Sequence, residues 1–176
     1  IGGMPEAVQV YAESASVSEV ADVQRSIVET YQDDFAKYAR QKELALMQRI
    51  FRTLPSTIGQ KVKYSNLAKE QRAKDVRGII DLLCKAQICH KVIHSHCSGL
   101  PLLANSDENT YKLLFMDVGM AAYLTGLDWG AMQAMDRNEL VNEGKLAEQF
   151  VGQHLMRPLE PPRLTYWLRE VKSANA

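Results

Sequence analysis

Apolar residues recur every three or four positions in the first part of the chain, which is the spacing of helices with one buried face. A helix is predicted from about Glu6 to Glu13, because the proline before it fits a first helical turn. Ser16 or Ser18 can cap a second, longer helix. Its expected buried stripe is Val20, Ala21, Val23, Ile27, Val28, Tyr31, Phe35 and Tyr38. A third helix is predicted from about Lys42 to Leu54, and Pro55 is expected to end it.

The middle of the chain changes from helical to alternating periodicity. After a short extended piece at residues 62–64 and a brief turn, a helix is predicted from about Ala73 to Lys85. Its apolar face is Val76, Ile79, Ile80 and Leu83. Ile88 to Ser95 and Tyr111 to Met116 are predicted to pair as a hairpin. This order of elements is that of a winged helix, in which a hairpin covers three helices too small to close a core alone.

The last third is predicted to hold two more helices and a strand. Asp117 can cap a helix over Val118 to Thr125 that Gly126 ends, and a loop or short helix follows around residues 129–135. A strong helix is expected over residues 140–156, ended by prolines, and then a short strand over 164–168. The apolar side of that helix is Val141, Leu146, Phe150, Val151 and Leu155.

These elements predict a mainly helical α+β chain in three parts. The divisions are linker helices over residues 1–40, a winged-helix domain over 41–126 and a partial nuclease-like domain over 127–176; the resemblance described below underlies these assignments. Methionine and aromatic residues at helical spacing (Met47, Phe51 and Phe150) are interpreted as core, and Trp167 as a packing residue.

Composition narrows the function classes. The chain has 176 residues, and 21 Lys and Arg balance 21 Asp and Glu, which argues against a protein whose main task is to coat DNA or an anionic membrane. The longest apolar run, residues 113–124, is interrupted by Asp117 and is too short to span a bilayer, so no membrane partner is expected. Three closely grouped cysteines fit a reducing cytoplasm better than a disulfide framework.

Five strings occur together and in order: residues 2–8 (GGMPEAV), 27–34 (IVETYQDD), 112–120 (KLLFMDVGM), 144–151 (GKLAEQFV) and 166–169 (YWLR). Together they resemble the bacterial and archaeal ATPases that have an N-terminal P-loop (AAA-like) module followed by a C-terminal domain of unknown function. The resemblance implies that the ATPase module lies upstream of Ile1, and the chain has no G-x-x-x-x-G-K-[ST] loop of its own. ATP and Mg²⁺ are therefore expected on that module. The chain is interpreted as a fragment without a complete catalytic site or cofactor, which regulates its own ATPase module or engages a target.

In this family the C-terminal domain is similar to a winged helix joined to a PD-(D/E)XK nuclease-like fold, whose carboxylates hold magnesium. Glu148 matches the acidic residue on the helix, and Glu170 with Lys172 mimics the Glu-x-Lys strand. Residues 169–176 can be read as a polar loop before an acidic strand, or as a splice that makes Glu170 and Lys172 the genuine pair. Neither interpretation completes a metal site, so the alternative of a Mg²⁺-dependent nuclease needs further residues.

A basic segment supports another alternative, a DNA-binding winged helix. From Lys61 to Lys91 there are eight Lys and Arg against three Asp and Glu. Near the start of the helix that could enter a major groove lie Lys69, Arg72, Lys74 and Arg77. Such contacts give salt-dependent affinity. A solvated or inter-domain face is the competing interpretation.

Two clusters are interpreted as structural. Cysteines and histidines between residues 84 and 97 follow no zinc spacing, and alternation places His90, His94 and His96 on one strand face and Cys89 and Cys97 on the other. Asp33 and Asp34 point about 100° apart on a helix, so surface charge is expected there rather than a metal pair.

Overall fold

The computed structural model describes residues 1–97, 99–127, 143–156 and 164–168. These ranges are mostly helical with one small mixed sheet, which confirms the predicted α+β class. The elements in order are α1 (Pro5–Ser14), α2 (Val17–Tyr38), α3 (Gln41–Thr53), η1 (Leu54–Thr57), α4 (Tyr64–Leu67), α5 (Ala73–Lys85), β1 (Cys89–Ser95), η2 (Leu102–Asn105), β2 (Ser106–Phe115), α6 (Val118–Leu124), α8 (Glu143–Met156) and β3 (Thr165–Tyr166).

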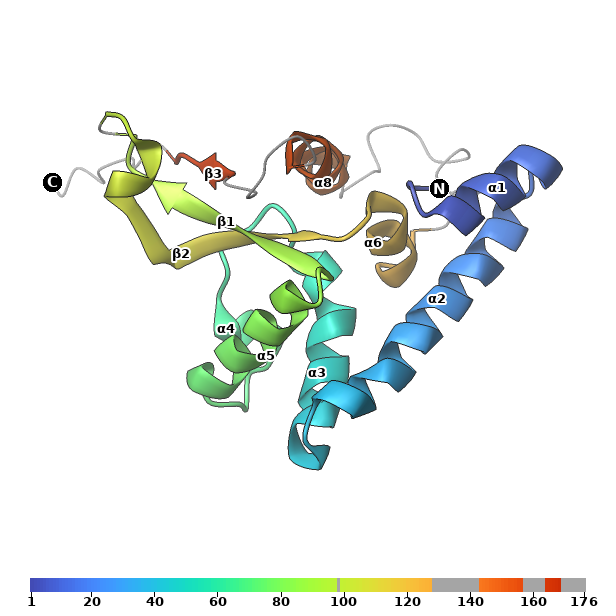
Figure 1. Ribbon diagram of the computed structural model, residues 1–176, viewed down its shortest axis with the longest axis horizontal. Coiled ribbons are helices and arrows are strands. Elements are labelled where there is room, and N and C mark those ends of the chain that lie inside the picture. Colours follow the sequence, from blue (N-terminus) through green and yellow to red (C-terminus); the bar gives the residue numbers. More distant parts are fainter. Residues whose placement is uncertain (98, 128–142, 157–163, 169–176) are drawn as a thin grey trace, which may run out of the picture.

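Helix α2 forms the outer side of the molecule, and α1 folds back beside its beginning (Figure 1). Ser16 is its N-cap, and the Glu19 backbone N–H donates to the Ser16 hydroxyl at 3.3 Å. Val20, Val28 and Phe35 are buried as predicted. Tyr38 is 73% exposed, so its predicted burial is wrong. The helix ends at Tyr38, one turn beyond the last residue that reaches the core.

Three helices and a hairpin follow in the predicted order. Helix α3 ends at Thr53 as expected, but Pro55 does not end the helical backbone. It lies in the first turn of the 3₁₀ helix η1. Backbone N–H groups in a first turn have no partner within the helix, so proline, which lacks an N–H, loses no hydrogen bond there. Helix α5 has the predicted bounds, and the four residues of its predicted apolar face are buried.

The sheet has the strand order β2-β1-β3, with β1 antiparallel to β2 and parallel to β3. The register is interrupted after Ile93, which pairs with Tyr111, because the next residue, His94, pairs with Asp107. Strand β2 therefore starts five residues before the predicted position and contains a bulge. The third strand pairs through only Thr165 and Tyr166, so Trp167 lies beyond the sheet, 56% exposed, and its predicted packing role is wrong.

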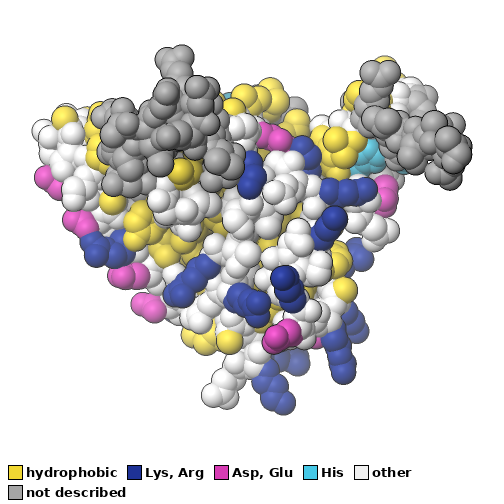
Figure 2. Space-filling view, turned by 180° about the vertical axis from the view of Figure 1, so that it is seen from behind, with side chains coloured by type: hydrophobic (Ala, Val, Ile, Leu, Met, Phe, Trp, Pro, Cys, Tyr) yellow, Lys and Arg dark blue, Asp and Glu magenta, His cyan; other side chains and the backbone are white. Residues whose placement is uncertain are grey.

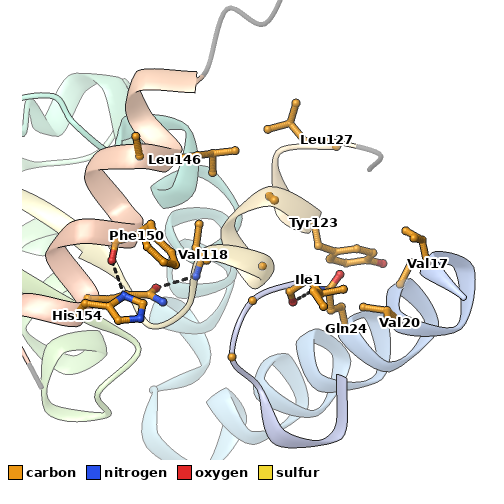
Figure 3. A pocket seen from close by; sticks show the side chains of 18 residues that line it. Ile1, Val17, Val20, Gln24, Val118, Tyr123, Leu127, Leu146, Phe150 and His154 are labelled. Carbon is orange, nitrogen blue, oxygen red and sulfur yellow. Dashed lines mark hydrogen bonds between the residues drawn. The ribbon is translucent and has the colours of Figure 1, made fainter. Parts of the chain in front are cut away.

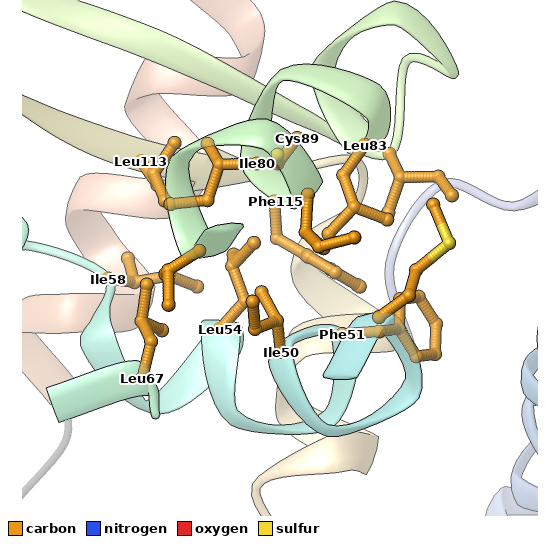
Figure 4. Close-up of a cluster of buried hydrophobic side chains, with 14 of the residues drawn as sticks. Ile50, Phe51, Leu54, Ile58, Leu67, Ile80, Leu83, Cys89, Leu113 and Phe115 are labelled. Atoms are coloured by element: carbon orange, nitrogen blue, oxygen red, sulfur yellow. The ribbon is translucent and has the colours of Figure 1, made fainter. Parts of the chain in front are cut away.

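The core lies between the three helices and the hairpin (Figures 1 and 4). Phe51 is its centre, with ring centroids 5.2 Å from Phe35 and 5.7 Å from Phe115. Around it pack fully buried aliphatic residues, among them Ile50, Leu54, Ile58, Ile80, Leu83 and Leu113. Burying each such side chain contributes about 1.5–3 kcal/mol, so this cluster is the main source of stability.

Helix α8 lies on the opposite face of the hairpin from α3 and α5 (Figure 1). The predicted burial of its apolar side is wrong for Phe150, Val151 and Leu155, which are each slightly more than half exposed. The cause is that its inner face is formed by polar residues and a glycine, described below. Residues 140–142 of this predicted helix, the predicted loop at 129–135, and Glu170 with Lys172 lie outside the described residues.

Candidate functional site

Glu148, the predicted acidic helix residue, points from α8 toward the sheet. Its Oε1 lies 2.7 Å from the Nζ of Lys112 on β2, and the Lys112 side chain is only 15% exposed. Glu148 also approaches the backbone before α4, because a Cβ on Gly59 would lie 3.2 Å from its Oε2. Among the described residues, Glu148 is therefore the counter-ion of a half-buried lysine.

Aromatic side chains extend this ion pair along the sheet. The Lys112 Nζ lies 5.2 Å from the ring centroid of Tyr166 on β3, and that ring lies 5.3 Å from the His94 ring on β1. The His96 ring contacts His94 in turn, at 4.8 Å. Burial, followed by the charges of Asp107 and Glu148, raises the pKa of Tyr166. Its hydroxyl is buried and has no hydrogen-bond partner in the described part of the chain.

Among the described residues, the cluster combines one carboxylate, one ammonium, the phenol of Tyr166 and the imidazoles of His94 and His96. In the ranges that the structure describes, no three His, Cys, Asp or Glu side chains are grouped so that they could hold a metal ion. The other two predicted nuclease residues, Glu170 and Lys172, lie outside those ranges. The predicted Glu-x-Lys partnership with Glu148 therefore stays a prediction.

The residue after Glu148 fixes this helix on the sheet. Gln149 is fully buried, accepts from the Phe115 backbone N–H at 2.8 Å and donates to the Phe115 carbonyl at 2.7 Å. Its amide thus completes the hydrogen bonds of the strand end as a neighbouring strand would. Gln153 accepts from the Val118 N–H at 2.9 Å, and Gly152 lets the helix approach Leu114 closely. Periodicity could not find this contact, because the residues that make it are polar.

The predicted DNA-contact residues lie together at the start of α5. Lys69, Arg72, Lys74 and Arg77 are all exposed. Helix α3 and the segments around it add Arg40, Lys42, Arg49 and Arg52, which are also exposed. Figure 2 shows the basic side chains over the part of the molecule that holds α3 to α5, while acidic side chains line the opposite edge near α2.

Charge is divided sharply between the two parts. Residues 40–91 contain twelve Lys and Arg against four Asp and Glu, whereas residues 1–39 contain two against seven. Of the twelve, only Lys91 lies within ion-pair distance of a carboxylate that belongs to the described residues, that of Asp81. On α2, both Arg25 and Lys37 are paired. Asp34 is the partner of Lys37, which fits the predicted surface role of Asp33 and Asp34.

The placement of these cations opposes the helix dipole. Arg72 is the N-cap of α5 and Lys74 lies in its first turn, where the partial charge of a helix is positive. Cations there cost roughly 0.3–1 kcal/mol each, partly offset by Asp75 in the same turn. Gly78 lies on the exposed side of the same helix, and no atom lies near the position of a Cβ there. The local charges thus weaken the helix slightly and leave an anion-attracting surface with room for close approach.

The first residues of the chain are locked onto the start of α6. Asp117, the predicted N-cap, accepts from the Gly119 and Met120 N–H groups at 2.8 and 3.0 Å and from the Gly3 N–H at 2.7 Å. A Cβ on Gly2 would lie 2.1 Å from Asp117 Oδ1, and one on Gly119 would lie 2.0 Å from the Ile1 carbonyl oxygen. Two of the five family-like strings, residues 2–8 and 112–120, therefore meet in one contact that only glycine permits.

Beside this contact lies an apolar cavity of about 850 Å³ between α2, α6 and α8 (Figure 3). Its labelled apolar lining includes Val17, Val20, Val118, Leu127, Leu146 and Phe150. Four polar side chains line it, and three of them bond the backbone: Gln24 donates to the Ile1 carbonyl, Gln153 accepts from the Val118 N–H, and His154 Nδ1 meets the Phe150 carbonyl. The fourth is Tyr123 of α6. The volume suits a small ligand, but these bonds leave few polar groups to orient one.

Comparison with known protein families shows the family to which this chain belongs. It is an α+β protein whose helices and hairpin surround one core, and none of the helices that the structure describes is long and apolar enough to cross a membrane. Residues 1–130 match the family described as Domain of unknown function (DUF8612), and the chain belongs to that family. The match covers α1 to α6 and ends before α8 and Glu148. No curated protein and no solved structure matches the chain.

Proposed function

We propose that this chain is a target-engaging domain without a complete catalytic site, attached to a P-loop (AAA-like) ATPase module. The contact between Gly2–Gly3 and the Asp117–Gly119 turn is the observation that supports this best. It holds the chain where an upstream module would join, through the bond from the Gly3 N–H to Asp117, the N-cap of α6, and the bond from Gln24 to the Ile1 carbonyl. Because this contact ties the first residues to both α2 and α6, a movement of a preceding module would displace these two helices directly. A cytoplasmic location goes with this proposal, since all three cysteines are free.

Two measurements test this proposal. The purified chain should release no phosphate from ATP above the buffer rate, and the coding sequence upstream of Ile1 should contain a G-x-x-x-x-G-K-[ST] loop. ATP turnover by the chain alone, or an upstream sequence without that loop, would overturn it.

A second candidate, DNA binding by a winged helix, is favoured by a separate observation: eleven cations of residues 40–91 form no ion pair with a carboxylate in the described part of the chain. In this proposal α5 contacts phosphates through Lys74 and Arg77. The hairpin loop contributes shape rather than charge, because residues 92–110 contain no Lys or Arg. Expected affinity is non-specific and weak, with a Kd of about 10⁻⁴–10⁻⁶ M at physiological salt.

Fluorescence anisotropy with a labelled duplex of about 20 base pairs, near two helical turns, tests this candidate. Binding should weaken as salt rises from about 50 to about 200 mM, and K74Q/R77Q should reduce the slope of log K against log salt by about 0.9 for each phosphate that the protein no longer neutralises. The matched control is R25Q/K37Q, which removes two cations that are already paired on α2. Equal effects of both variants, or no salt dependence, would exclude α5 as the DNA-binding element.

The nuclease alternative rests on Glu148 alone among the described residues. Its pairing with Lys112 leaves Oε2 as the atom available to a cation. A chain extended beyond Ala176 should cleave DNA with Mg²⁺ only if further carboxylates reach this position. Cleavage that survives E148Q would remove Glu148 from this role.

A further inference from the structure

Cys84 and Cys89 bring two thiols into contact at the junction of α5 and β1. Their sulfur atoms lie 3.5 Å apart, although the residues belong to different elements. The turn between them is held by bonds from the Gln87 N–H to the Cys84 carbonyl and from the Ile88 N–H to the Leu83 carbonyl, both 3.0 Å. Gln87 has a φ of 59°, a left-handed conformation that reverses the chain within four residues. The turn therefore holds the two cysteine residues next to each other, and rotation of their side chains sets the distance between the sulfurs.

The two thiols differ in environment. Cys89 is buried, whereas Cys84 is half-buried. Both line a cavity of about 170 Å³, together with His90, Lys91, Met156 and Leu164. A water molecule occupies about 30 Å³ of liquid, so a molecule the size of hydrogen peroxide fits beside the sulfurs.

The hydrogen bond between the two thiols and the groups around them shift the pKa values of the two cysteines in opposite directions. The hydrogen bond with Cys89, together with the ammonium of Lys91, lowers the pKa of Cys84, although burial and the carboxylate of Asp81 oppose the shift. The same hydrogen bond together with burial raises the pKa of Cys89. Cys84 is thus the thiolate-forming partner, and Cys89 keeps its proton until it is needed.

We propose that Cys84 and Cys89 are a redox-active dithiol that a peroxide converts into an intramolecular disulfide. The Cys84 thiolate attacks one peroxide oxygen, which breaks the O–O bond, releases hydroxide and leaves a sulfenic acid on Cys84. The Cys89 sulfur then attacks the Cys84 sulfur, and the S–O bond breaks as the Cys89 proton and the hydroxyl leave as water. Overall, two thiols and one peroxide give one disulfide and two waters. The gap to a bonded S–S distance is about 1.5 Å, which side-chain rotation and a small backbone shift can close.

The test uses the full chain with the exposed third cysteine removed, C97S. A slight excess of hydrogen peroxide at about pH 7.5 should reduce its free thiols from two to none, and the monomer should lose the mass of two hydrogen atoms. Dithiothreitol should restore both thiols, and the digest should show a peptide that joins Cys84 to Cys89. These results do not depend on the proposed ATPase or DNA function.

Single-thiol variants distinguish disulfide formation between Cys84 and Cys89 from the oxidation of one thiol alone. C84S/C97S and C89S/C97S each retain one thiol and should gain oxygen or form chain-to-chain dimers instead of losing two hydrogens. C89A/C97S, which has no side-chain donor at position 89, should also alkylate more slowly with iodoacetamide at neutral pH than Cys84 does in C97S. Retention of both thiols in C97S, oxygen uptake without a crosslink, or dimers alone would overturn the proposal.

Discussion

Helices α5 and α8 lie on opposite faces of the same hairpin and are attached to it in opposite ways. Helix α5 buries Val76, Ile79, Ile80 and Leu83 against the core and exposes its charged side. Helix α8 turns Glu148, Gln149 and Gly152 toward the hairpin and Gln153 toward the start of α6. Its exposed side carries Phe150, Val151 and Leu155. One contact is apolar packing, and the other consists of hydrogen bonds to a strand end with close backbone approach.

The two contacts differ in how the free energy that holds each helix on the hairpin is distributed over side chains. Apolar packing is spread over many contacts and tolerates repacking. The α8 contact depends on a few directional bonds, so the loss of one side chain leaves buried backbone groups unpaired. Helix α5 is therefore expected to be robust to small changes on its buried face, and α8 to be sensitive at Gln149.

The largest expected effect comes from one substitution made on both helices. L83A removes a fully buried side chain of α5 and should lower the free energy of unfolding by about 2–5 kcal/mol. L155A removes a half-exposed side chain of α8 and should cost less than about 1 kcal/mol. Urea denaturation followed by circular dichroism measures both. Equal losses of stability would mean that the outer side of α8 is buried in solution.

A change at Gln149 tests the polar contact itself. Q149L keeps the volume of the side chain but removes the bonds to the Phe115 N–H and carbonyl, so stability should fall by about 2 kcal/mol. Q153L, which frees the partly buried Val118 N–H, is the milder comparison. Hydrogen exchange of the Phe115 amide should accelerate in Q149L. An unchanged exchange rate would show that α8 does not protect the strand end.

Alanine at one glycine in each helix should act in opposite directions. G78A on α5 adds a methyl in open space and should stabilise the chain by about 0.5–1 kcal/mol through better helix propensity. G152A on α8 places a Cβ 2.6 Å from a Leu114 methyl carbon, and the shift this forces should cost about 1–2 kcal/mol. Thermal melts of the two variants decide the signs. Stabilisation by both would contradict the close approach of α8.

The smallest expected effect is a pH dependence at His90, on β1. Burial lowers the pKa of His90 from its ordinary 6.5, so the unfolded chain binds a proton more readily than the folded chain. This contribution to stability is present above pH 6.5 and is lost as the pH falls through the lower folded value. Denaturant midpoints between about pH 5 and pH 8 should drop less on acidification in H90Q than in the wild type, with the exposed H96Q as control. A similar drop in H90Q would assign the acid sensitivity elsewhere.

The sequence predicted the elements whose stability depends on their own pattern. The bounds of α5, the N-caps Ser16 and Asp117, and the hairpin follow from apolar spacing and capping residues, and the structure confirms them. The orientation of α8 did not follow, because its apolar residues were expected to face the core although its contact with the sheet is polar. The early start of β2 was missed because Asp107, Glu108 and Asn109 have low strand propensity and form the bulged part of the ladder.

The candidate sites also differ in how much of each could be predicted from the sequence. The basic residues around the start of α5 were selected from local charge and the order of elements; they are exposed, and their contact with DNA stays a prediction. Neither the pairing of Glu148 with Lys112 nor the sulfur contact between Cys84 and Cys89 could be read from spacing. The first joins residues 36 positions apart, and the second depends on the left-handed turn at Gln87.

By itself the sequence determined the helices and hairpin of this protein and the division between an acidic and a basic part, because periodicity, capping and charge act over a few residues or simply add along the chain. Only the tertiary structure decided which face of α8 meets the sheet, how the first glycines lock onto Asp117, and which two thiols touch. Those outcomes depend on hydrogen bonds and close approaches between distant segments, and such contacts leave no period in the sequence.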